Sequence, residues 1–454
     1  MGSPATASMQ DPAAPTGLDP GNPSSPDHPL LRLVVAGSVD DGKSTLVGRL
    51  LFETQSILAD QYDAIELASR RRGAQEVDLA LLTDGLRAER EQGITIDVAY
   101  RYFSTPRRTF ILADTPGHTQ YTRNTVTGAS TADAALLLVD ARAGVLPQTR
   151  RHAALMAMLA VPHLVVAVNK MDTIDWDRSR FEQVAADIAA MAAAVGVDGV
   201  TVVPVSALTG QHVVDRPAGS AGNDPRGAWY DGPSLLEVVE SLEPSTEVRA
   251  APFRLPVQLV IRPRTAEHPD YRGLAGRVAS GSVAVGDRVV AEPEGSTSIV
   301  VGLDTPTGPV ERVGAGDTVT VLLADDLDIG RGQVLVAAGE PPPLRARELD
   351  GVVCWLDPRP ATPRQRVLVK VGTAVVRGML APARAHWDVD EQRWRTDDTP
   401  PALNDIVRVT IALSDQVAYD PYRVDRATGG FLVIDPAGGA TLAAGMAGEP
   451  AGAR

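Results

Sequence analysis

The sequence predicts an α/β domain of the doubly wound type, with a mainly parallel sheet, followed by two β-barrel domains. Between Leu31 and about Leu242, short apolar runs typical of strands buried on both faces alternate with stretches that have the spacing of amphipathic helices. Beyond about residue 250 the helical stretches stop, and valine-rich runs are interrupted by Gly and Asp at short intervals, as in closed all-β domains. A chain of 454 residues has the length of about three domains.

The first domain contains five expected strands and three expected helices. The strands are LLRLVVAG, TFILAD, AALLLVD, HLVVAVN and VTVVPVS; the helices are KSTLVGRLLFETQ, TRRHAALMAMLA and RFEQVAADIAAMAAAV. We expect this domain over 29–246, the first barrel over 252–340 and the second over 346–442, with the proline cluster GEPPPLRARE between the barrels. Residues 1–28, rich in Pro, Ser, Gly and Ala, are expected to be a disordered tail, and residues 443–454 a loose C-terminus.

Composition restricts the possible functions. A net charge of −14 gives no general attraction to nucleic acid or to anionic membranes. No apolar run approaches the roughly 18 residues that a membrane helix needs, and the N-terminus lacks the pattern of a secretory signal. The single cysteine, Cys354, excludes an internal disulfide framework and is expected in a core. We therefore expect a cytoplasmic protein that binds neither membrane nor nucleic acid.

The chain has only three lysines among 43 Lys and Arg residues, and two of the three lie in candidate nucleotide-binding motifs. Lysine is a compact point charge on a thin stem, whereas arginine is a broad planar fork, so a tight loop around a phosphate accepts the first and not the second. This explains Lys43 and Lys170. Lys370, in VLVKVG, has no such motif around it, and an exposed strand position is the simpler interpretation.

The stretch GSVDDGKS matches the pattern G-x-x-x-x-G-K-[ST] and stands between an expected strand and an expected helix. In this pattern backbone N–H groups close around the phosphates, the lysine reaches the β/γ oxygens, and the hydroxyl binds Mg²⁺. The chain should therefore bind a nucleoside triphosphate with Mg²⁺. The expected phosphate-binding residues are Gly37, Ser38, Val39, Asp40, Asp41, Gly42, Lys43, Ser44 and Thr45, with Gly117 from a second motif.

That second motif, LADTPGH, places Asp114 at a strand end, where a carboxylate can hold the Mg²⁺ shell, although it could also cap a helix. His118 could orient the attacking water, with surface packing as the alternative. Thr95, in EREQGITID, could close over Mg²⁺ and the γ-phosphate as a switch segment does, or could be a plain strand residue. The expected metal ligands are thus Ser44, Thr95 and Asp114, and the expected catalytic residues are Lys43, Thr95 and His118.

The motif NKMD, Asn169 to Asp172, follows another strand and indicates guanine. A carboxylate at Asp172 can accept from N1–H and the N2 amino group of guanine, a pair that adenine does not offer. The stem of Lys170 can lie over the purine, and a backbone amide of the SAL stretch can meet the guanine O6. The expected guanine-binding residues are Asn169, Lys170, Asp172, Ser206, Ala207 and Leu208. Four such motifs in this order predict a P-loop GTPase.

Several strings closely resemble the GTP-binding large subunit of heterodimeric ATP sulfurylase, the CysN type, which is itself similar to elongation factor Tu. They are GSVDDGKST, LLTDGLRAEREQGITIDVAYRYFST, DTPGHTQYTRN and NKMD, and the resemblance extends from about Leu31 to Gly445. It implies a three-domain GTPase that associates, as a heterodimer or a higher assembly, with a small catalytic subunit of the CysD type. That partner converts ATP and sulfate to adenosine 5′-phosphosulfate (APS) and pyrophosphate, and GTP hydrolysis drives this uphill step.

The resemblance has departures, and a rival interpretation remains. Gln211 and His212 stand where the family tends to carry Asp-Asn, and the Pro/Gly-rich segment that follows, about 215–228, looks lengthened. There is no second G-x-x-x-x-G-K-[ST], as a fused APS kinase would have, and no SGGKDS-like loop for AMP transfer. The alternative function is an elongation factor Tu-like GTPase that delivers aminoacyl-tRNA on the same three-domain plan.

Overall fold

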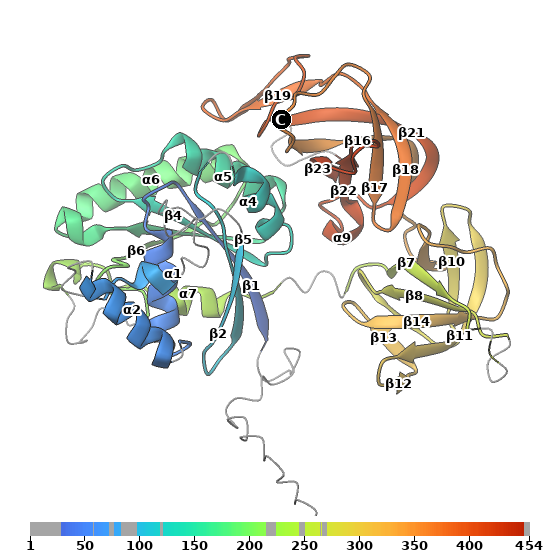
Figure 1. The fold of residues 1–454 in the computed structure, drawn as a ribbon, viewed down its shortest axis with the longest axis horizontal. Coiled ribbons are helices and arrows are strands. Elements are labelled where there is room, and N and C mark those ends of the chain that lie inside the picture. Colours follow the sequence, from blue (N-terminus) through green and yellow to red (C-terminus); the bar gives the residue numbers. More distant parts are fainter. Residues whose placement is uncertain are drawn as a thin grey trace, which may run out of the picture.

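The computed structural model describes residues 29–57, 59–71, 77–82, 98–118, 121–214, 224–244, 250–263, 265 and 270–448. Figure 1 shows an α/β domain, a barrel beside its helices α4 and α5, and a further barrel below that one. The predicted fold class, an α/β domain followed by two β-barrels, is confirmed. The expected tail, Thr95 and most of the lengthened segment lie outside the described residues. No helix in the described ranges is long and apolar enough to cross a membrane.

The first domain is built on a six-stranded sheet in the order β2-β3-β1-β4-β5-β6. Its strands run parallel except β2, which pairs antiparallel with β3 at the sheet edge and was not among the expected strands. The inner strand β4 is buried along its whole length, which explains why its sequence is a continuous apolar run. The strands are β1 (Leu30–Gly37), β2 (Ala99–Ser104), β3 (Thr109–Asp114), β4 (Ala134–Asp140), β5 (His163–Asn169) and β6 (Thr201–Pro204).

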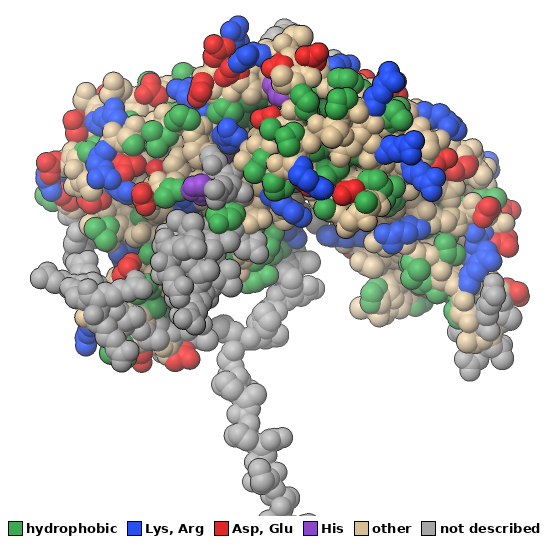
Figure 2. Space-filling model, turned by 45° about the horizontal axis from the view of Figure 1, so that its top comes forward, with side chains coloured by type: hydrophobic (Ala, Val, Ile, Leu, Met, Phe, Trp, Pro, Cys, Tyr) green, Lys and Arg blue, Asp and Glu red, His purple; other side chains and the backbone are tan. Residues whose placement is uncertain are grey.

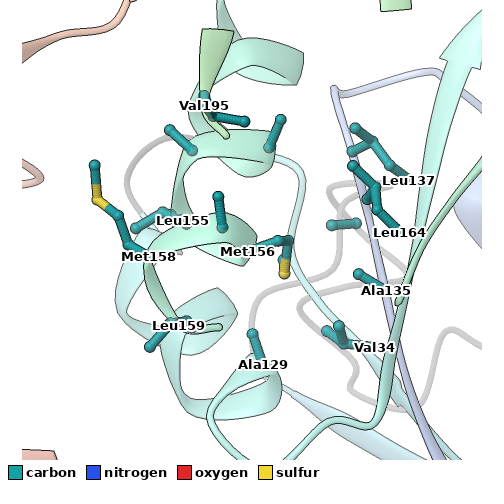
Figure 3. Close-up of a cluster of buried hydrophobic side chains, with 14 of the residues drawn as sticks. Val34, Ala129, Ala135, Leu137, Leu155, Met156, Met158, Leu159, Leu164 and Val195 are labelled. Carbon is teal, nitrogen blue, oxygen red and sulfur yellow. The ribbon is translucent and has the colours of Figure 1, made fainter. Parts of the chain in front are cut away.

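Helices cover both faces of this sheet. One face packs against α1 and α7, and the other packs against α4, α5 and α6, where Met156 of α5 lies toward Leu137 and Ala135 of β4 (Figure 3). The helices are α1 (Lys43–Glu53), α2 (Ala59–Arg71), α4 (Thr122–Ala129), α5 (Pro147–Met158), α6 (Arg178–Ala194) and α7 (Leu235–Ser241), with the 3₁₀ turns η1 (Leu79–Leu82), η3 (Met171–Ile174) and η4 (Pro225–Gly227).

The first barrel closes through β10, β15, β7, β8, β14 and β11, because β11 pairs back onto β10. Alternate valines point inward, as the period of two along each strand requires. Its strands are β7 (Arg254–Ile261), β8 (Gly273–Arg277), β9 (Ser282–Ala284), β10 (Arg288–Glu292), β11 (Ser296–Thr305), β12 (Gly308–Pro309), β13 (Arg312–Gly314), β14 (Thr318–Leu323) and β15 (Val334–Ala337).

The second barrel closes through β16, β23, β22, β17, β18 and β21, since β16 also pairs with β21; β19 and β20 form an added hairpin. Its core contains the buried side chains that alternate along these strands. Its elements are β16 (Leu344–Trp355), β17 (Arg366–Val371), β18 (Ala374–Leu380), β19 (Ala385–Asp388), β20 (Arg393–Arg395), β21 (Ile406–Tyr419), α9 (Arg426–Gly429), β22 (Gly430–Ile434) and β23 (Thr441–Ala447).

The expectation of a loose C-terminus over 443–454 is wrong for residues 443–447. They belong to β23, which pairs with both β16 and β22 and so closes the barrel. The small residues that suggested looseness have a packing reason: a Cβ at Gly445 would lie 2.2 Å from Cζ of Phe431, so the aromatic ring occupies the space of a side chain. A strand rich in Ala and Gly is stable here because its neighbours supply the bulk.

The second barrel packs directly on the first domain. Its outer face contributes Val352, Cys354 and Met446 to the same buried cluster as helices α5 and α6. Burial raises the pKa of the Cys354 thiol to about 12, so it is a neutral core side chain, as expected. The two barrels are joined by a buried ion pair in which Arg254 of β7 donates to both carboxylate oxygens of Asp420, at 2.9 and 3.0 Å.

Candidate nucleotide-binding site

The loop between β1 and α1 has the backbone of a phosphate-binding turn. Asp40 and Gly42 have φ angles of 67° and 92°, in the left-handed region, and the turn brings the chain directly into the first residue of the helix. A Cβ at Gly42 would lie 2.4 Å from Nδ2 of Asn169, so only glycine fits there. The loop is therefore built tightly against the strand end that carries the NKMD motif.

Lys43 points back into this loop. Its ammonium donates hydrogen bonds to the carbonyls of Gly37 (3.0 Å) and Ser38 (2.8 Å), and the side chain is buried. Burial lowers the pKa of Lys43, while the nearby carboxylate of Asp114 acts in the opposite direction. A buried ammonium satisfied by only two carbonyls lies where an anion would stabilise it strongly.

Asp41 stabilises the turn from within. Its carboxylate accepts from the backbone N–H of Ser38 at 2.6 Å, which closes the loop over three residues. Burial raises the pKa of this carboxyl, and the hydrogen bond from Ser38 only partly offsets that effect. We therefore interpret Asp41 as a residue that shapes the loop.

The LADTPGH motif lies against the loop, as the sequence predicted. Asp114 ends β3 and is 1% exposed, and Thr115 donates to the carbonyl of Val35 at 2.7 Å, which ties the two strand ends together. A Cβ at Gly117 would lie 2.3 Å from Nζ of Lys43, so its backbone approaches the lysine closely. The ring of His118 is half-buried and lies edge-on to Tyr121, with 6.2 Å between ring centroids.

Asn169 connects the phosphate loop with the SAL stretch. Its Nδ2 donates to the carbonyl of Asp41 at 2.8 Å, and its Oδ1 accepts from the backbone N–H of Ala207 at 2.9 Å. The side chain is 2% exposed, so both bonds are shielded from water. The residue that the sequence assigned to guanine thus holds together the two loops that would flank a nucleotide.

Lys170 adopts a left-handed backbone, with φ of 64°, and its ammonium donates to the carbonyl of Asp40 and pairs with Asp140 at 3.0 Å. Asp140 also accepts from Arg142. Although burial acts to raise it, these hydrogen bonds hold the pKa of Asp140 well below its usual value. Sequence reasoning missed Asp140; the signal available was a carboxylate directly after the apolar run AALLLVD.

The SAL stretch is held by a second residue that the sequence did not reveal. Arg49 of α1 donates to the carbonyl of Ala207 at 3.1 Å and to that of Leu208, so the helix that begins at the phosphate loop also fixes the turn after β6. Ser206 is fully buried, and its hydroxyl accepts from the N–H of Thr209 at 3.2 Å. Leu208 is 58% exposed. No motif marks Arg49, because its partners lie about 160 residues away.

Asp172 lies in the 3₁₀ turn η3, directly after Lys170, and is half-buried. Beyond the SAL stretch, Gln211 exchanges two hydrogen bonds with the backbone of Asp224, at 3.1 and 2.8 Å, and so closes the base of the lengthened segment. His212 is fully buried between Trp176 and Tyr230, and burial lowers its pKa. The two departures from the family pattern therefore have structural roles beside the site.

The remaining predicted residues belong to the phosphate loop and to the first turn of the helix that follows it, while Thr95 falls outside the described residues. Ser44 and Thr45 form the first turn of α1 and are half-buried, whereas Val39 and Asp40 are exposed. Within the described residues there is no group of three or more His, Cys, Asp or Glu side chains that could hold a metal alone. A hydroxyl at Ser44 and a carboxylate at Asp114 fit Mg²⁺, which is usually bound through one or two protein oxygens together with phosphates and water.

This arrangement defines the class of protein: a P-loop GTPase domain carrying two β-barrels. In agreement, residues 28–245 match the family model of the elongation factor Tu GTP binding domain, and residues 348–447 match the GTP-eEF1A C-terminal domain-like model. Among solved structures, that of Sup35 complexed with GMPPNP matches 93% of this chain and 94% of its own at 24% identity, with a TM-score of 0.42, which is too low to add to the assignment.

Comparison with curated proteins narrows the class. The chain is 47% identical to a bifunctional enzyme CysN/CysC of Mycobacterium tuberculosis, over 92% of this chain and 67% of that protein. It is 44% identical to sulfate adenylyltransferase subunit 1 of Bacteroides fragilis, over 92% of this chain and 85% of that protein, and 46% identical to that of Methylorubrum populi, over 89% and 84%. The chain belongs to the sulfate adenylyltransferase subunit 1 family.

Proposed function

We propose that this chain is the GTP-hydrolysing subunit of a sulfate adenylyltransferase, and that its hydrolysis of GTP drives the formation of APS and pyrophosphate from ATP and sulfate on a small catalytic partner subunit. Membership of the subunit 1 family supports the assignment to sulfate activation. The naming of those relatives as one subunit supports a partner. The alternative, delivery of aminoacyl-tRNA, has the weaker support, because elongation factors share only GITI of the long string LLTDGLRAEREQGITIDVAYRYFST.

The observation that carries the proposal is the double hydrogen bond of Asn169. It ties the strand end that carries NKMD to the phosphate loop and to the SAL stretch, at the carboxyl ends of the parallel strands, which is the usual ligand position in an open parallel sheet. In this arrangement Lys43 and Gly117 bind the β/γ-phosphates, Ser44, Asp114 and Thr95 hold the Mg²⁺ environment, and His118 orients water. Asp172 selects guanine, with Lys170 along the purine face and Ser206, Ala207 and Leu208 at its O6.

Coupling to a remote reaction imposes a thermodynamic condition. GTP must bind one conformation of the complex more tightly than another, because a ligand with equal affinity for both shifts nothing. A contact between the second barrel and the first domain supports such coupling. Arg426, on the second barrel, donates to the carbonyls of Ala129, Ser130 and Ala132, at the end of the helix that follows the DTPGH motif.

The test mixes this chain with the small subunit, ATP, sulfate and Mg²⁺, and follows APS with GTP, with GDP and with neither. We expect strong APS accumulation only with GTP, together with faster GTP turnover when the partner is present. APS formation that is indifferent to GTP, while the chain still hydrolyses it, would refute the driven reaction.

A nucleotide switch provides the internal control. Asp172→Asn should weaken GTP binding and favour xanthosine triphosphate, whose C2 carbonyl can accept from the new amide. APS formation by this variant should then depend on xanthosine triphosphate in place of GTP. An unchanged preference for GTP would reject the role of Asp172, and driven APS formation would be tested independently by the wild type.

A further inference from the structure

Three neighbouring cavities, each sharing lining residues with the next, lie across all three domains. The first, about 260 Å³, lies over Tyr100 and Tyr102 of β2 and reaches Thr131. The second, about 350 Å³, shares Thr131 and lies between α4 and the second barrel. The third, about 800 Å³, shares Gly372 and Ala427 with the second and extends along the first barrel to Leu259. We call this the three-domain groove.

The charge of the groove is opposite to that of the molecule. About one residue in eight of the chain is Asp or Glu, and the net charge is −14, yet no carboxylate lines any of the three cavities in the described structure. Four cations do: Arg32, Lys370, Arg426 and Arg277. Figure 2 shows several Lys and Arg side chains along the lower edge of the barrels in that view.

Three of these four cations have no carboxylate partner among the described residues. Arg426 is committed to the carbonyls at the end of α4, and Arg277 donates to the carbonyl of Gly316. Within the described part of the chain, Arg32, Arg277 and Lys370 form no ion pair. Cations without carboxylate partners, in a groove free of carboxylates, favour an acidic occupant.

Lys370 is the third lysine of the chain. The strand β17 alternates strictly, with Val369 and Val371 in the barrel core, so Lys370 points outward, half-buried, opposite Leu432 of β22. A slim ammonium on an aliphatic stem suits this apolar wall, where a guanidinium would need more room. The position that looked like an ordinary exposed strand residue is thus a charged point in the middle of the groove.

The residues that line the three-domain groove favour a protein as the occupant over a nucleic acid. Apart from the four cations they are largely Gly, Ala, Val and Leu, and both ends present exposed apolar side chains: Tyr100 and Tyr102 at one end, 48% and 65% exposed, and Leu259 at the other, 58% exposed. Aromatic and aliphatic anchors with a few charges are typical of protein interfaces, whereas a nucleic acid needs a cation for most of its phosphates.

We propose that the three-domain groove docks an extended acidic segment of the small catalytic subunit, with carboxylates paired to Lys370, Arg277 and Arg32 and apolar side chains on Tyr102 and Leu259. This rests on the proposed function, which supplies the partner. The lining of the first cavity includes β2, the strand that follows the GITID segment in the sequence, and the end of α4, the helix that follows DTPGH. An occupant would therefore contact the elements that follow the two motifs expected to sense the γ-phosphate, which suits a partner whose binding depends on the nucleotide.

The experiment measures the dissociation constant of the small subunit for the full-length chain at two salt concentrations. Lys370→Glu and Arg277→Glu should each weaken binding by about tenfold or more, because each sets like charges opposite one another. Both substitutions should also reduce the dependence of the dissociation constant on salt concentration. The matched controls are Arg366→Glu, exposed on the same strand as Lys370, and Arg288→Glu, exposed on the same barrel as Arg277; both lie outside the groove and should change binding less than twofold.

The outcomes separate the two proposals. Arg277 is exposed, so its variant tests the groove without a change inside the second barrel, and GTP turnover by the isolated chain should stay at the wild-type rate. Unchanged binding by both groove variants would overturn the docking site while leaving the proposed function intact. A wild-type chain that binds no small subunit would overturn both. If transfer RNA binds the wild-type chain and this binding is lost in the same variants, the occupant of the groove is a nucleic acid and the peptide proposal is wrong.

Discussion

The side chain of Asn169 is hydrogen-bonded to both Asp41 and Ala207. Its amide nitrogen donates to the carbonyl of Asp41 at 2.8 Å, and its amide oxygen accepts from the backbone N–H of Ala207 at 2.9 Å. The two loops are separated by more than 160 residues. Their relative position therefore depends on a buried amide whose two ends have opposite hydrogen-bonding character.

Asn169→Asp should uncouple these loops. The isosteric carboxylate can still accept from Ala207, but it cannot donate to the carbonyl of Asp41 and repels it, so we expect a loss of about 1–3 kcal/mol in unfolding free energy and weaker GTP and GDP binding alike. Chemical denaturation and nucleotide titration measure the two effects. The exposed substitution Asp187→Asn is the control and should alter neither; a variant with wild-type affinity for both nucleotides would show that the bridge does not position the site.

Thr95→Ala tests the proposed switch residue. If Thr95 closes over Mg²⁺ and the γ-phosphate, its removal should leave GDP affinity nearly unchanged, since GDP lacks that phosphate. GTP turnover should fall by about 10- to 100-fold, a cost typical of a disturbed metal environment. Single-turnover hydrolysis and GDP titration are the measurements. Equal loss of affinity for the two nucleotides would point to a structural defect.

His152 should make stability depend on pH. It is fully buried on α5, bonded to Gln148 at 3.0 Å, and burial, with a smaller effect from Lys43, lowers its pKa to about 3. Above pH 6.5, the usual pKa of histidine, the His152 side chain is neutral in both the folded and the unfolded chain. As the pH falls from 6.5 toward 3, only the unfolded chain binds the proton, so the stability of the folded state decreases. Between pH 7 and pH 5 the loss should be about 2 kcal/mol.

His152→Phe removes the titrating group and should flatten the stability curve over this range by that amount, whatever its effect at pH 7. Urea unfolding at pH 7, 6 and 5 measures the difference in slope between the two proteins. Parallel curves would mean that His152 does not contribute to the pH dependence.

The ion pair between the barrels should be costly to break. Asp420→Ala leaves the buried guanidinium of Arg254 without its carboxylate, at a cost of about 3–5 kcal/mol. Asp326→Ala is the matched control, because it also removes a carboxylate from arginine, but its own side chain is 79% exposed and its pairs should contribute no more than about 1 kcal/mol. Thermal unfolding compares the two. Equal destabilisation would show that burial does not decide the strength of these pairs.

The sequence predicted the parts of the candidate site that are marked by motifs of contiguous residues. The phosphate loop, LADTPGH, NKMD and SAL each contain a motif, and the sheet order brings their strand ends to one edge. It failed where a partner is remote: Arg49 contacts Ala207 across 158 residues, and nothing near either residue announces it. It also failed where a neighbour supplies the bulk, as Phe431 does for Gly445, and at β2, whose exposed face carries tyrosines that a buried-strand pattern does not include.

The thiol of Cys354 sits 2% exposed in β16, in a cluster shared by the second barrel and the first domain. Because it is the chain's single cysteine, its thiol can serve as a chemical probe for the separation of the second barrel from the first domain. An alkylating reagent can modify the buried thiol only when the structure around it opens, so the rate of labelling reports the free energy of that opening at this one position. The same rate, followed with GTP and with GDP, would show whether the nucleotide tightens or loosens the junction.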